Sequence, residues 1–355
     1  MLDAQNDELP FITGRNKDDF KGALLQNGDI IIADTAEDET TGKVCEIVNI
    51  QDKDVVAGLH TMVCRPKNKT AEGYFGYYMN SSSYHHQLLP LMQGIKVLSL
   101  SKTNVQKTTV KYPKDKAEQQ KIADCLRCID TLITLHQRKY EKLVNIKKSM
   151  LDKMFPQNGA SVPEIRFKGF TDPWEQRKLK ELYFQLTERN TDLLPYQKTL
   201  SVATMSFKTD GNGAADTSLA NYKRLRTGDI AFEGHTSKEF RYGRFVLNDV
   251  GDGIMSPRFS ALRPLHEMPI NFWKYYIHYE PIMRKVLVNS TKAGTMMNEL
   301  VINDFLQGSI LVPSMTEQQA IGRFFKQLDT LITLHQRKLE KLQNIKKSCL
   351  EKMFV

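Results

Sequence analysis

The chain contains one long segment twice. Residues 118–155 and residues 317–354 lie 199 positions apart and agree at 26 of 38 positions, and residues 130–139 recur unchanged as residues 329–338. Two copies so far apart indicate a duplicated unit of about half the chain, and an internal repeat constrains a fold before any other feature does. A chain of 355 residues has room for two or three domains, so the repeat predicts where the chain divides.

Each copy of the repeat has the pattern of one long helix. Apolar residues return at steps of three and four positions in both copies, and the first copy contains neither glycine nor proline. A helix of 38 residues is about 57 Å long, which is too long for a helix without a partner along its length. We therefore expect the two copies to pair as an antiparallel coiled coil. His136 and His335 then form a polar layer that fixes the register, which we favour over a catalytic or metal-binding role.

The residues that precede each copy have a mixed α and β pattern. In the first half we expect a turn and strand at 28–33, a strand at 44–50, a helix at 73–91 and a strand at 94–100. The second half repeats a skeleton of this pattern, because residues 225–230 match 25–30, Arg263-Pro264 match Arg65-Pro66, and Tyr275-Tyr276 match Tyr77-Tyr78. The predicted fold class is α+β, with two mixed α/β domains separated by two long α-helices that pair as an antiparallel coiled coil.

The composition is that of a soluble globular protein, with 41% hydrophobic and 26% charged residues. No apolar run reaches the roughly 18 residues of a membrane span, and the first residues lack the pattern of a secretory signal. Five cysteines without framework spacing are typical of a reducing compartment. We therefore predict a cytoplasmic protein with no membrane partner. Cys125 and Cys128 form a C-x-x-C pair that the second copy lacks, so helix-surface positions are favoured over a zinc or redox site.

The positive charge is concentrated in the repeat. The first copy has eight Lys or Arg against five Asp or Glu and the second has eight against four, so the two copies hold +7 of the net charge of +9. Ten basic residues occupy five equivalent positions in the two copies, which favours docking of two identical partner subunits, with phosphate contact as a second role. These candidate docking residues are Arg138, Lys139, Lys142, Lys147, Lys148, Arg337, Lys338, Lys341, Lys346 and Lys347.

The sequence contains no convincing catalytic or metal-binding pattern. It lacks the N-P-P-[YF] motif of amino-methyltransferases, the G-x-x-x-x-G-K-[ST] phosphate loop and H-E-x-x-H. Asp210-Gly211-Asn212-Gly213 begins like a calcium loop but lacks the later carboxylate, so a turn is favoured. His85-His86 has no third ligand at a suitable spacing. We therefore predict no catalytic residue, no metal and no cofactor bound by this chain.

The two halves differ in what they keep constant. The helices are nearly identical and the mixed domains are dissimilar, so the helices fit one geometry or one partner twice while the domains recognise different things. An antiparallel pair of duplicated helices has a pseudo-two-fold axis, and double-stranded DNA offers a matching axis. The pattern predicts two readers on a rigid spacer, which contact two different half-sites separated by unread bases.

Candidate DNA contacts combine positive charge with aromatic or small polar residues. In the second domain they are Lys238, Arg241, Tyr242 and Arg244, in an expected loop or hairpin, with Arg258 after Ser256-Pro257. In the first domain the analogous places hold Lys43, His60 and Arg65. The alternative for each of these side chains is a solvated surface position.

Several segments carry a resemblance to a known family. They are residues 163–170 (PEIRFKGF), 174–179 (WEQRKL), 225–230, 310–313 (ILVP) with 317–321 (EQQAI), and the LITLHQRK helices. With these segments the chain resembles the specificity subunits of type I restriction-modification enzymes, over nearly its whole length. The resemblance also implies that the polar loop 289–298 approaches DNA, which adds Lys292, Thr295 and Asn298 to the candidates.

The resemblance implies two target recognition domains that bind double-stranded DNA and two conserved helical regions that dock two methyltransferase subunits. Methylation of adenine would use S-adenosylmethionine in those subunits, and motor-nuclease subunits that join the complex would use ATP and Mg²⁺. The chain itself would be a non-catalytic DNA-binding specificity subunit, used in DNA methylation and host defence. The alternatives from other classes are a helical scaffold whose globular domains bind proteins, and an enzyme acting by itself.

The expected domains follow the repeat. They are a first recognition domain at 1–112, a first conserved helical region with its linker at 113–158, a second recognition domain at 159–312 and a second helical region at 313–355. Only 27 residues precede Gly28, whereas more than fifty separate Trp174 from Gly228. We therefore expect the first recognition domain to be shortened at its N-terminus.

Overall fold

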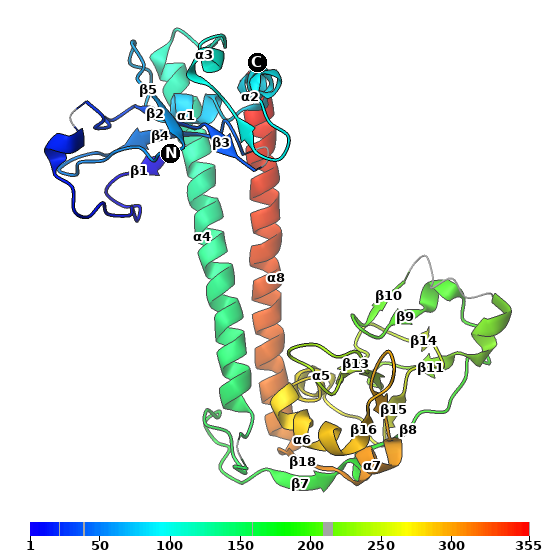
Figure 1. The fold of residues 1–355 in the computed structure, drawn as a ribbon. Coiled ribbons are helices and arrows are strands. Elements are labelled where there is room, and N and C mark those ends of the chain that lie inside the picture. The colour runs from blue at the N-terminus through cyan, green and yellow to red at the C-terminus, as the bar shows by residue number, and fades with distance from the viewer. Residues whose placement is uncertain (21, 38–39, 158, 209–215, 355) are drawn as a thin grey trace. The chain divides into compact units, whose positions relative to one another are not determined.

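The protein is described by a computed structural model that covers residues 1–20, 22–37, 40–157, 159–208 and 216–354. The turn predicted at residues 210–213 lies outside the described residues. The chain forms two compact units, one of residues Met1–Lys139 with His335–Val355 and one of residues Tyr140–Leu334. Each unit therefore combines one mixed α/β domain with part of both long helices (Figure 1).

The domain of the first unit is built on a sheet with the strand order β1-β4-β2-β5. Strand β2 (Ile30–Ala33) is antiparallel to β4 (Val44–Val48) and to β5 (Thr61–Cys64), and β1 (Leu2–Asp3) is parallel to β4. The other elements are η1 (Lys17–Phe20), β3 (Thr35–Ala36), α1 (Tyr74–Tyr78), α2 (Ser82–Leu88), η2 (Leu89–Leu91), β6 (Leu98–Ser99) and α3 (Lys102–Val105).

The helix predicted at 73–91 is divided into α1 and α2. Asn80, between them, turns its side-chain amide to the edge of β4, where it accepts from the Val44 N–H at 3.0 Å and donates to the Val44 carbonyl. Asparagine side chains compete in this way with helical hydrogen bonding. Of the strand predicted at 94–100, only β6 forms, and it pairs with β3.

The domain of the second unit contains a sheet with the order β13-β12-β15-β8. It consists of β13 (Arg244–Leu247), β12 (Ile230–Glu233), β15 (Ala261–Pro264) and β8 (Tyr183–Gln185), all paired antiparallel. Smaller antiparallel pairs are β18 (Ser309–Val312) with β7 (Glu175–Lys178), β11 (Lys223–Leu225) with β14 (Gly253–Met255), β10 (Ser206–Phe207) with β9 (Leu200–Ser201), and β16 (Thr291–Lys292) with β17 (Glu299–Leu300). The helices are η3 (Leu179–Glu181), η4 (Tyr196–Lys198), η5 (Asp216–Asn221), α5 (Ile270–Tyr276), α6 (Glu280–Ser290) and α7 (Ile302–Gln307).

Both central strands begin with the same turn. Gly28 and Gly228 have φ angles of 87° and 95°, which favour glycine. The N–H of each donates at 2.8 Å, to the carbonyl of Ile47 in β4 or of Asn248 directly after β13. The next residue, Asp29 or Asp229, is buried, and its carboxylate accepts from the backbone N–H three residues earlier. The shared skeleton of the two halves is thus a turn that starts β2 and β12 in the same way.

The two long helices are α4 (Lys116–Met154) and α8 (Met315–Lys352). In the first unit Lys346 of α8 pairs with Asp130 of α4 at 2.6 Å, and in the second unit Lys147 of α4 pairs with Asp329 of α8 at 2.6 Å. These partners run in opposite directions along the chain, so the helices are antiparallel in each unit (Figure 1). The predicted fold class of two mixed α/β domains with an antiparallel pair of long helices is confirmed.

Each domain is attached to the helices in the same way. The hydroxyl of Tyr77 donates to Asp130 at 2.9 Å and that of Tyr275 donates to Asp329 at 2.5 Å. Burial, reinforced by the adjacent carboxylate, raises the pKa of both tyrosines, which keeps them protonated donors. Beside them the aromatic ring at the end of the other helix fills the core, with Phe354 against Tyr78 and Phe155 against Tyr276.

His136 and His335 face each other, as the sequence predicts, with their Nδ1 atoms 2.8 Å apart in the first unit. Burial and the neighbouring His136 lower the pKa of His335. Two ring nitrogens at this distance share a single proton, so one ring accepts while the other donates. The contact is polar and directional, and it is available in only one register of the helix pair.

We expect Tyr275→Phe to destabilise the attachment of α5 to α8 by about 2 kcal/mol, because the half-buried Asp329 carboxylate loses a hydrogen bond. Tyr77→Phe should have the same effect on α1 and α4. Native-state hydrogen exchange of the α5 and α1 amides measures both changes. Tyr140→Phe is the control, since the Tyr140 hydroxyl has no hydrogen-bond partner among the described residues. Equal effects of the three substitutions would contradict this account of the attachment.

Candidate nucleic-acid interface

Three connections of the second domain meet beyond the C-terminal end of β12. They are residues 234–243 between β12 and β13, residues 256–260 between β14 and β15, and residues 293–298 between β16 and β17. We call them the second loop cluster. The sequence-predicted candidates Lys238, Arg241, Tyr242, Arg258, Thr295 and Asn298 all lie in it.

The hairpin of β16 and β17 packs with its backbone directly against the backbone of the loop 234–243. The Asn298 N–H donates to the Gly234 carbonyl at 2.8 Å, and the Asn298 side chain donates to the Arg241 carbonyl at 3.1 Å. A Cβ at Gly234 would lie 2.1 Å from the Asn298 carbonyl oxygen, so only glycine permits this contact. Asn298 is therefore a residue that joins two loops, and its half-buried position follows from that role.

The cations of the second loop cluster are exposed. Lys238, Arg241 and Arg258 form no ion pair with any described residue. Arg258 lies at a cleft of about 340 Å³ that Thr295 and Asn298 also line, and its guanidinium reaches the Met296 sulfur at 3.8 Å. A guanidinium has five N–H donors, so these exposed groups without a carboxylate partner retain donors for an external acceptor.

Of the three remaining candidates, Arg244 and Tyr242 are engaged within the domain. The Arg244 guanidinium donates to the Ala203 carbonyl at 3.0 Å and lies 4.9 Å from the centre of the Phe240 ring. Tyr242 is half-buried against the core and has the Arg241 guanidinium 5.9 Å from its ring centre. Lys292 is exposed in β16, opposite Glu299 of β17. Arg244 and Tyr242 therefore support the loops that present Lys238, Arg241 and Arg258.

The strand registers show which residues correspond in the first domain. Val44 pairs with Ile32 as Phe245 pairs with Phe232, so Lys43 takes the place of Arg244. Cys64 pairs with Ile30 as Leu262 pairs with Ile230, so His60 takes the place of Arg258. Lys43 and His60 are both exposed beside the end of β2. The structure thus brings these two candidates together.

A loop that the sequence analysis missed completes this first loop cluster, which consists of the described residues 34–37, 40–43, 57–60 and 93–97. An added Cβ at Gly94 would lie 1.9 Å from the Val97 carbonyl oxygen, and one at Gly294 would lie 2.3 Å from that of Met297. The two tight turns are counterparts, and the turn of the first domain exposes Lys96. The sequence does contain a sign of this correspondence, because Gly94 and Gly294 lie 200 positions apart, as Gly28 and Gly228 do.

Arg65 lies at the opposite end of β5 from His60. Its guanidinium donates twice to the Asp29 carboxylate, at 2.7 Å each, and Arg263 makes the same pair with Asp229 at 2.9 and 2.8 Å. Burial opposes ionisation of Asp29, but the bonds from Arg65 outweigh it and lower the pKa of that carboxyl. Arg65 therefore neutralises the charge of the Asp29 carboxylate in the turn that begins β2. It lies away from the first loop cluster.

The ten basic helix candidates divide into two groups. Lys147 and Lys346 are half-buried, and besides their ion pairs they lie 5.0 and 5.9 Å from the ring centres of Tyr275 and Tyr77. The other eight are exposed on α4 and α8: Arg138, Lys139, Lys142, Lys148, Arg337, Lys338, Lys341 and Lys347.

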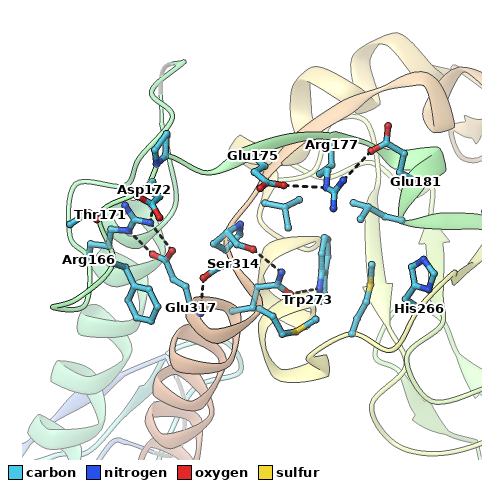
Figure 2. A pocket seen from close by; sticks show the side chains of 18 of the residues that line it. Arg166, Thr171, Asp172, Glu175, Arg177, Glu181, His266, Trp273, Ser314 and Glu317 are labelled. Atoms are coloured by element: carbon cyan, nitrogen blue, oxygen red, sulfur yellow. Dashed lines mark hydrogen bonds and ion pairs between the residues drawn. The ribbon is translucent and has the colours of Figure 1, made fainter.

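A pocket of about 420 Å³ lies where α8 of the second unit begins. Figure 2 shows Arg166 turned toward the buried Glu317, with two bonds of 2.7 Å, and the Arg166 guanidinium also donates to the Asp172 carbonyl. Gln318 accepts from the Trp273 indole N–H at 3.0 Å. The motif segments 163–170 and 317–321 thus contact each other through Arg166 and Glu317. The pocket lies where these two segments pack together.

Among the described residues, no group of three or more His, Cys, Asp or Glu side chains is placed to hold a metal ion. In the same part of the chain, no helix is long and apolar enough to cross a membrane.

A family model and a curated relative both match most of this chain. Residues 3–145 and 172–344 match the family described as the type I restriction modification DNA specificity domain. A protein of Methanocaldococcus jannaschii, described as a specificity subunit of the type I restriction enzyme MjaX, is 21% identical over 96% of this chain and 80% of its own length.

Solved structures share the fold. The S subunit of a type I restriction-modification system from M. genitalium matches with a TM-score of 0.59 and 14% identity, over 93% of this chain and 83% of that one. A chain from a study of assembly and conformational transition of the type I system matches with a TM-score of 0.50 and 15% identity, over 93% and 82%.

We expect Gly234→Ala to separate the β16–β17 hairpin from the 234–243 loop, because the new Cβ would meet the Asn298 carbonyl. Overpacking of this kind costs about 1–3 kcal/mol, and faster trypsin cleavage after Lys292 would report it. Gly58→Ala is the matched control, since a Cβ there meets open space. An unchanged cleavage rate in Gly234→Ala would show that the two loops do not depend on this contact.

Proposed function

The chain belongs to the type I restriction modification DNA specificity family, and from that membership we propose that it reads a bipartite site in double-stranded DNA and positions catalytic partner subunits on it. Sequence-specific DNA recognition is the activity of the family. The two half-sites, the docking surface and the residues in contact with bases are the parts that we add.

The observation that carries the proposal is the pair of loop clusters. Each lies at the same end of its sheet, beyond β2 or β12, and each exposes Lys or Arg side chains that form no ion pair with any described residue. Arginine pairs bidentately with the O6 and N7 atoms of guanine in the major groove, and lysine contacts phosphate as a compact charge. We assign base contact to Arg241 and Arg258, and phosphate contact to Lys238, Lys43 and Lys96.

The two clusters differ in sequence although their frames correspond. Arg258 in one cluster corresponds to His60 in the other. The sequence of the loop 234–243 does not resemble that of residues 34–43. Side chains that differ at equivalent positions present different donors to base edges, so two unlike half-sites follow. Polar loop residues such as Thr295 can add contacts in the cleft beside Arg258.

For the helices we propose docking of two identical methyltransferase subunits. Eight exposed basic residues repeat at equivalent positions of α4 and α8, so two copies of one acidic surface can bind them. Lys147 and Lys346 are already neutralised by Asp329 and Asp130, and they hold the helix pair together. S-adenosylmethionine, and ATP with Mg²⁺ for motor-nuclease subunits, would be bound by the partners.

We expect Arg241→Ala and Arg258→Ala each to weaken binding of the full chain to a duplex selected from a random library by about 1–3 kcal/mol, with little change for unrelated duplexes. Lys238→Ala should weaken both kinds of duplex equally and reduce the slope of log K against log salt by about one. Electrophoretic shift titrations at several salt concentrations measure these changes.

Arg177→Ala is the control, since Arg177 is exposed but lies in β7, outside the loop cluster. Binding that is indifferent to salt and sequence would favour a protein-binding scaffold instead. Methyl transfer from S-adenosylmethionine by the isolated chain would favour an enzyme.

A second test addresses the bipartite site. Inserting one heptad at equivalent positions of α4 and α8 keeps the seam in phase, so we expect a longer gap between the half-sites and unchanged half-site sequences. Mapping methylated adenines in cells that carry the chain with its partner subunits gives the result. A control variant receives the same seven residues in place of existing ones. Altered half-sites would contradict the role of the helices as a spacer.

A further inference from the structure

The sheet of the first domain ends in an open groove. Strand β5 is the edge of the order β1-β4-β2-β5, and within the described residues no strand lies on its outer side. Beside this edge is a groove of about 510 Å³ lined mainly by apolar side chains, with Val63, Cys64, Phe75, Val110 and Tyr112 among them. None of the described residues 1–29 lines it. Open edges next to apolar grooves are sites of strand addition.

The second domain has the same surface, and there it is covered. The sheet continues past β15 to β8, and β18 pairs with β7. Strands β7 and β8 belong to one continuous segment, residues 175–185, with η3 between them. A single stretch of chain therefore closes both edges in the second domain.

The strand registers show where a segment equivalent to β8 would lie in the first domain. Strand β8 pairs with Leu262, Arg263 and Pro264, and the strand correspondence places Cys64, Arg65 and Pro66 at these positions. All three line the groove. The groove thus follows the line that a counterpart of β8 would take.

The second edge corresponds as well. Lys111 donates its N–H to the Tyr78 hydroxyl at 2.9 Å, and Leu311 accepts from the equivalent Tyr276. Residues 109–112 therefore take the place of β18. Beneath β7 the side chains of Ile310 and Val312 are 5% and 8% exposed, whereas Val110 and Tyr112 are 44% and 42% exposed. Two large side chains are thus partly exposed where the second domain buries their counterparts.

The side chains that fill the site in the second domain are known. Leu179 and Tyr183 of the covering segment are 0% and 1% exposed, and the Tyr183 ring lies 5.8 Å from that of Trp273 in a T-shaped contact. Two positions before the shared Tyr-Tyr pair, Phe75 corresponds to Trp273, and Phe75 lines the groove. The groove offers an aromatic wall of the kind that the Tyr183 ring uses.

We propose that this groove binds a strand–turn–strand segment of a separate polypeptide, built like residues 175–185, which adds one strand to β5 and a second to residues 109–112. Its leucine and tyrosine, at the places of Leu179 and Tyr183, enter the groove. Main-chain hydrogen bonds supply affinity and the two side chains supply specificity.

A second copy of this chain is a less favourable occupant of the groove than a separate segment. In every copy the segment 175–185 already buries Leu179 and Tyr183 in its own domain. Exchange between copies would open one groove for each that it closes. A segment that is free before docking has no such contact to lose, although its ordering opposes binding.

The test uses the full chain and a synthetic peptide of residues 173–186. Cys64 lines the groove and is half-buried, whereas Cys125 and Cys128 are exposed on α4. A saturating peptide is expected to slow alkylation of Cys64 by about tenfold, since strand addition removes it from solvent, and to leave Cys125 and Cys128 unchanged. Peptides with Tyr183→Asp or Leu179→Asp should give no protection. Mass spectrometry of the alkylated chain measures each site separately.

Chain variants provide the matched comparison. Val110→Asp places a charge at the groove and should abolish protection, whereas Val288→Asp, at an equally exposed valine of α6, should not. Unprotected Cys64 at millimolar peptide would overturn the proposal, as would protection that persists in Val110→Asp. Self-association of the chain that Val110→Asp abolishes would identify a second copy as the occupant and would also overturn it.

Discussion

Asp130 and Asp329 each receive a lysine from the other long helix and a tyrosine hydroxyl from the adjacent domain. One carboxylate therefore links three elements that are distant in the sequence. A half-buried carboxylate that loses its partners is costly, whereas one that keeps a cation and a hydroxyl is stabilised. A shift of either helix by one turn, or of a domain along the helix, would break both bonds at once. The position of each domain on its helices depends on this contact.

The apolar seam alone would not give such definition. Long helices with repeated leucine and isoleucine can pair in more than one register, and polar contacts select among them at some cost in stability. The His136–His335 contact at 2.8 Å and the two Asp–Lys pairs at 2.6 Å act in this way. Phe155 and Phe354 then close the cores where the helices end. Apolar packing supplies the stability, and these few polar contacts supply the register.

The sequence predicted the parts of the fold that local periodicity and repetition determine. The long helices, the facing histidines and the strands after Gly28 and Gly228 all follow from spacing along the chain. The division of 73–91 into α1 and α2 did not, because it depends on the Asn80 side chain reaching β4, a contact with distant residues. For the same reason charge and residue type could not separate Arg241, which is exposed, from Arg244, which is held against Phe240 and the Ala203 carbonyl. Lys96 was missed because the match of Gly94 with Gly294 along the chain does not by itself place this turn beside the loop of β3, which the pairing of β3 with β6 does.

The contacts that fix the frame and the side chains that face outward do not overlap. Asp229 and Arg263 hold the start of β12, whereas Arg258 and the loop 234–243 lie beyond its other end. Loops attached to a sheet only through its strand ends can change sequence without disturbing the turn, the tyrosine or the helix seam. This separation explains how one chain carries two nearly identical helices beside two dissimilar loop clusters. Divergence at the loops costs the frame nothing, while a change at Asp130 or Asp329 would be felt by three elements together.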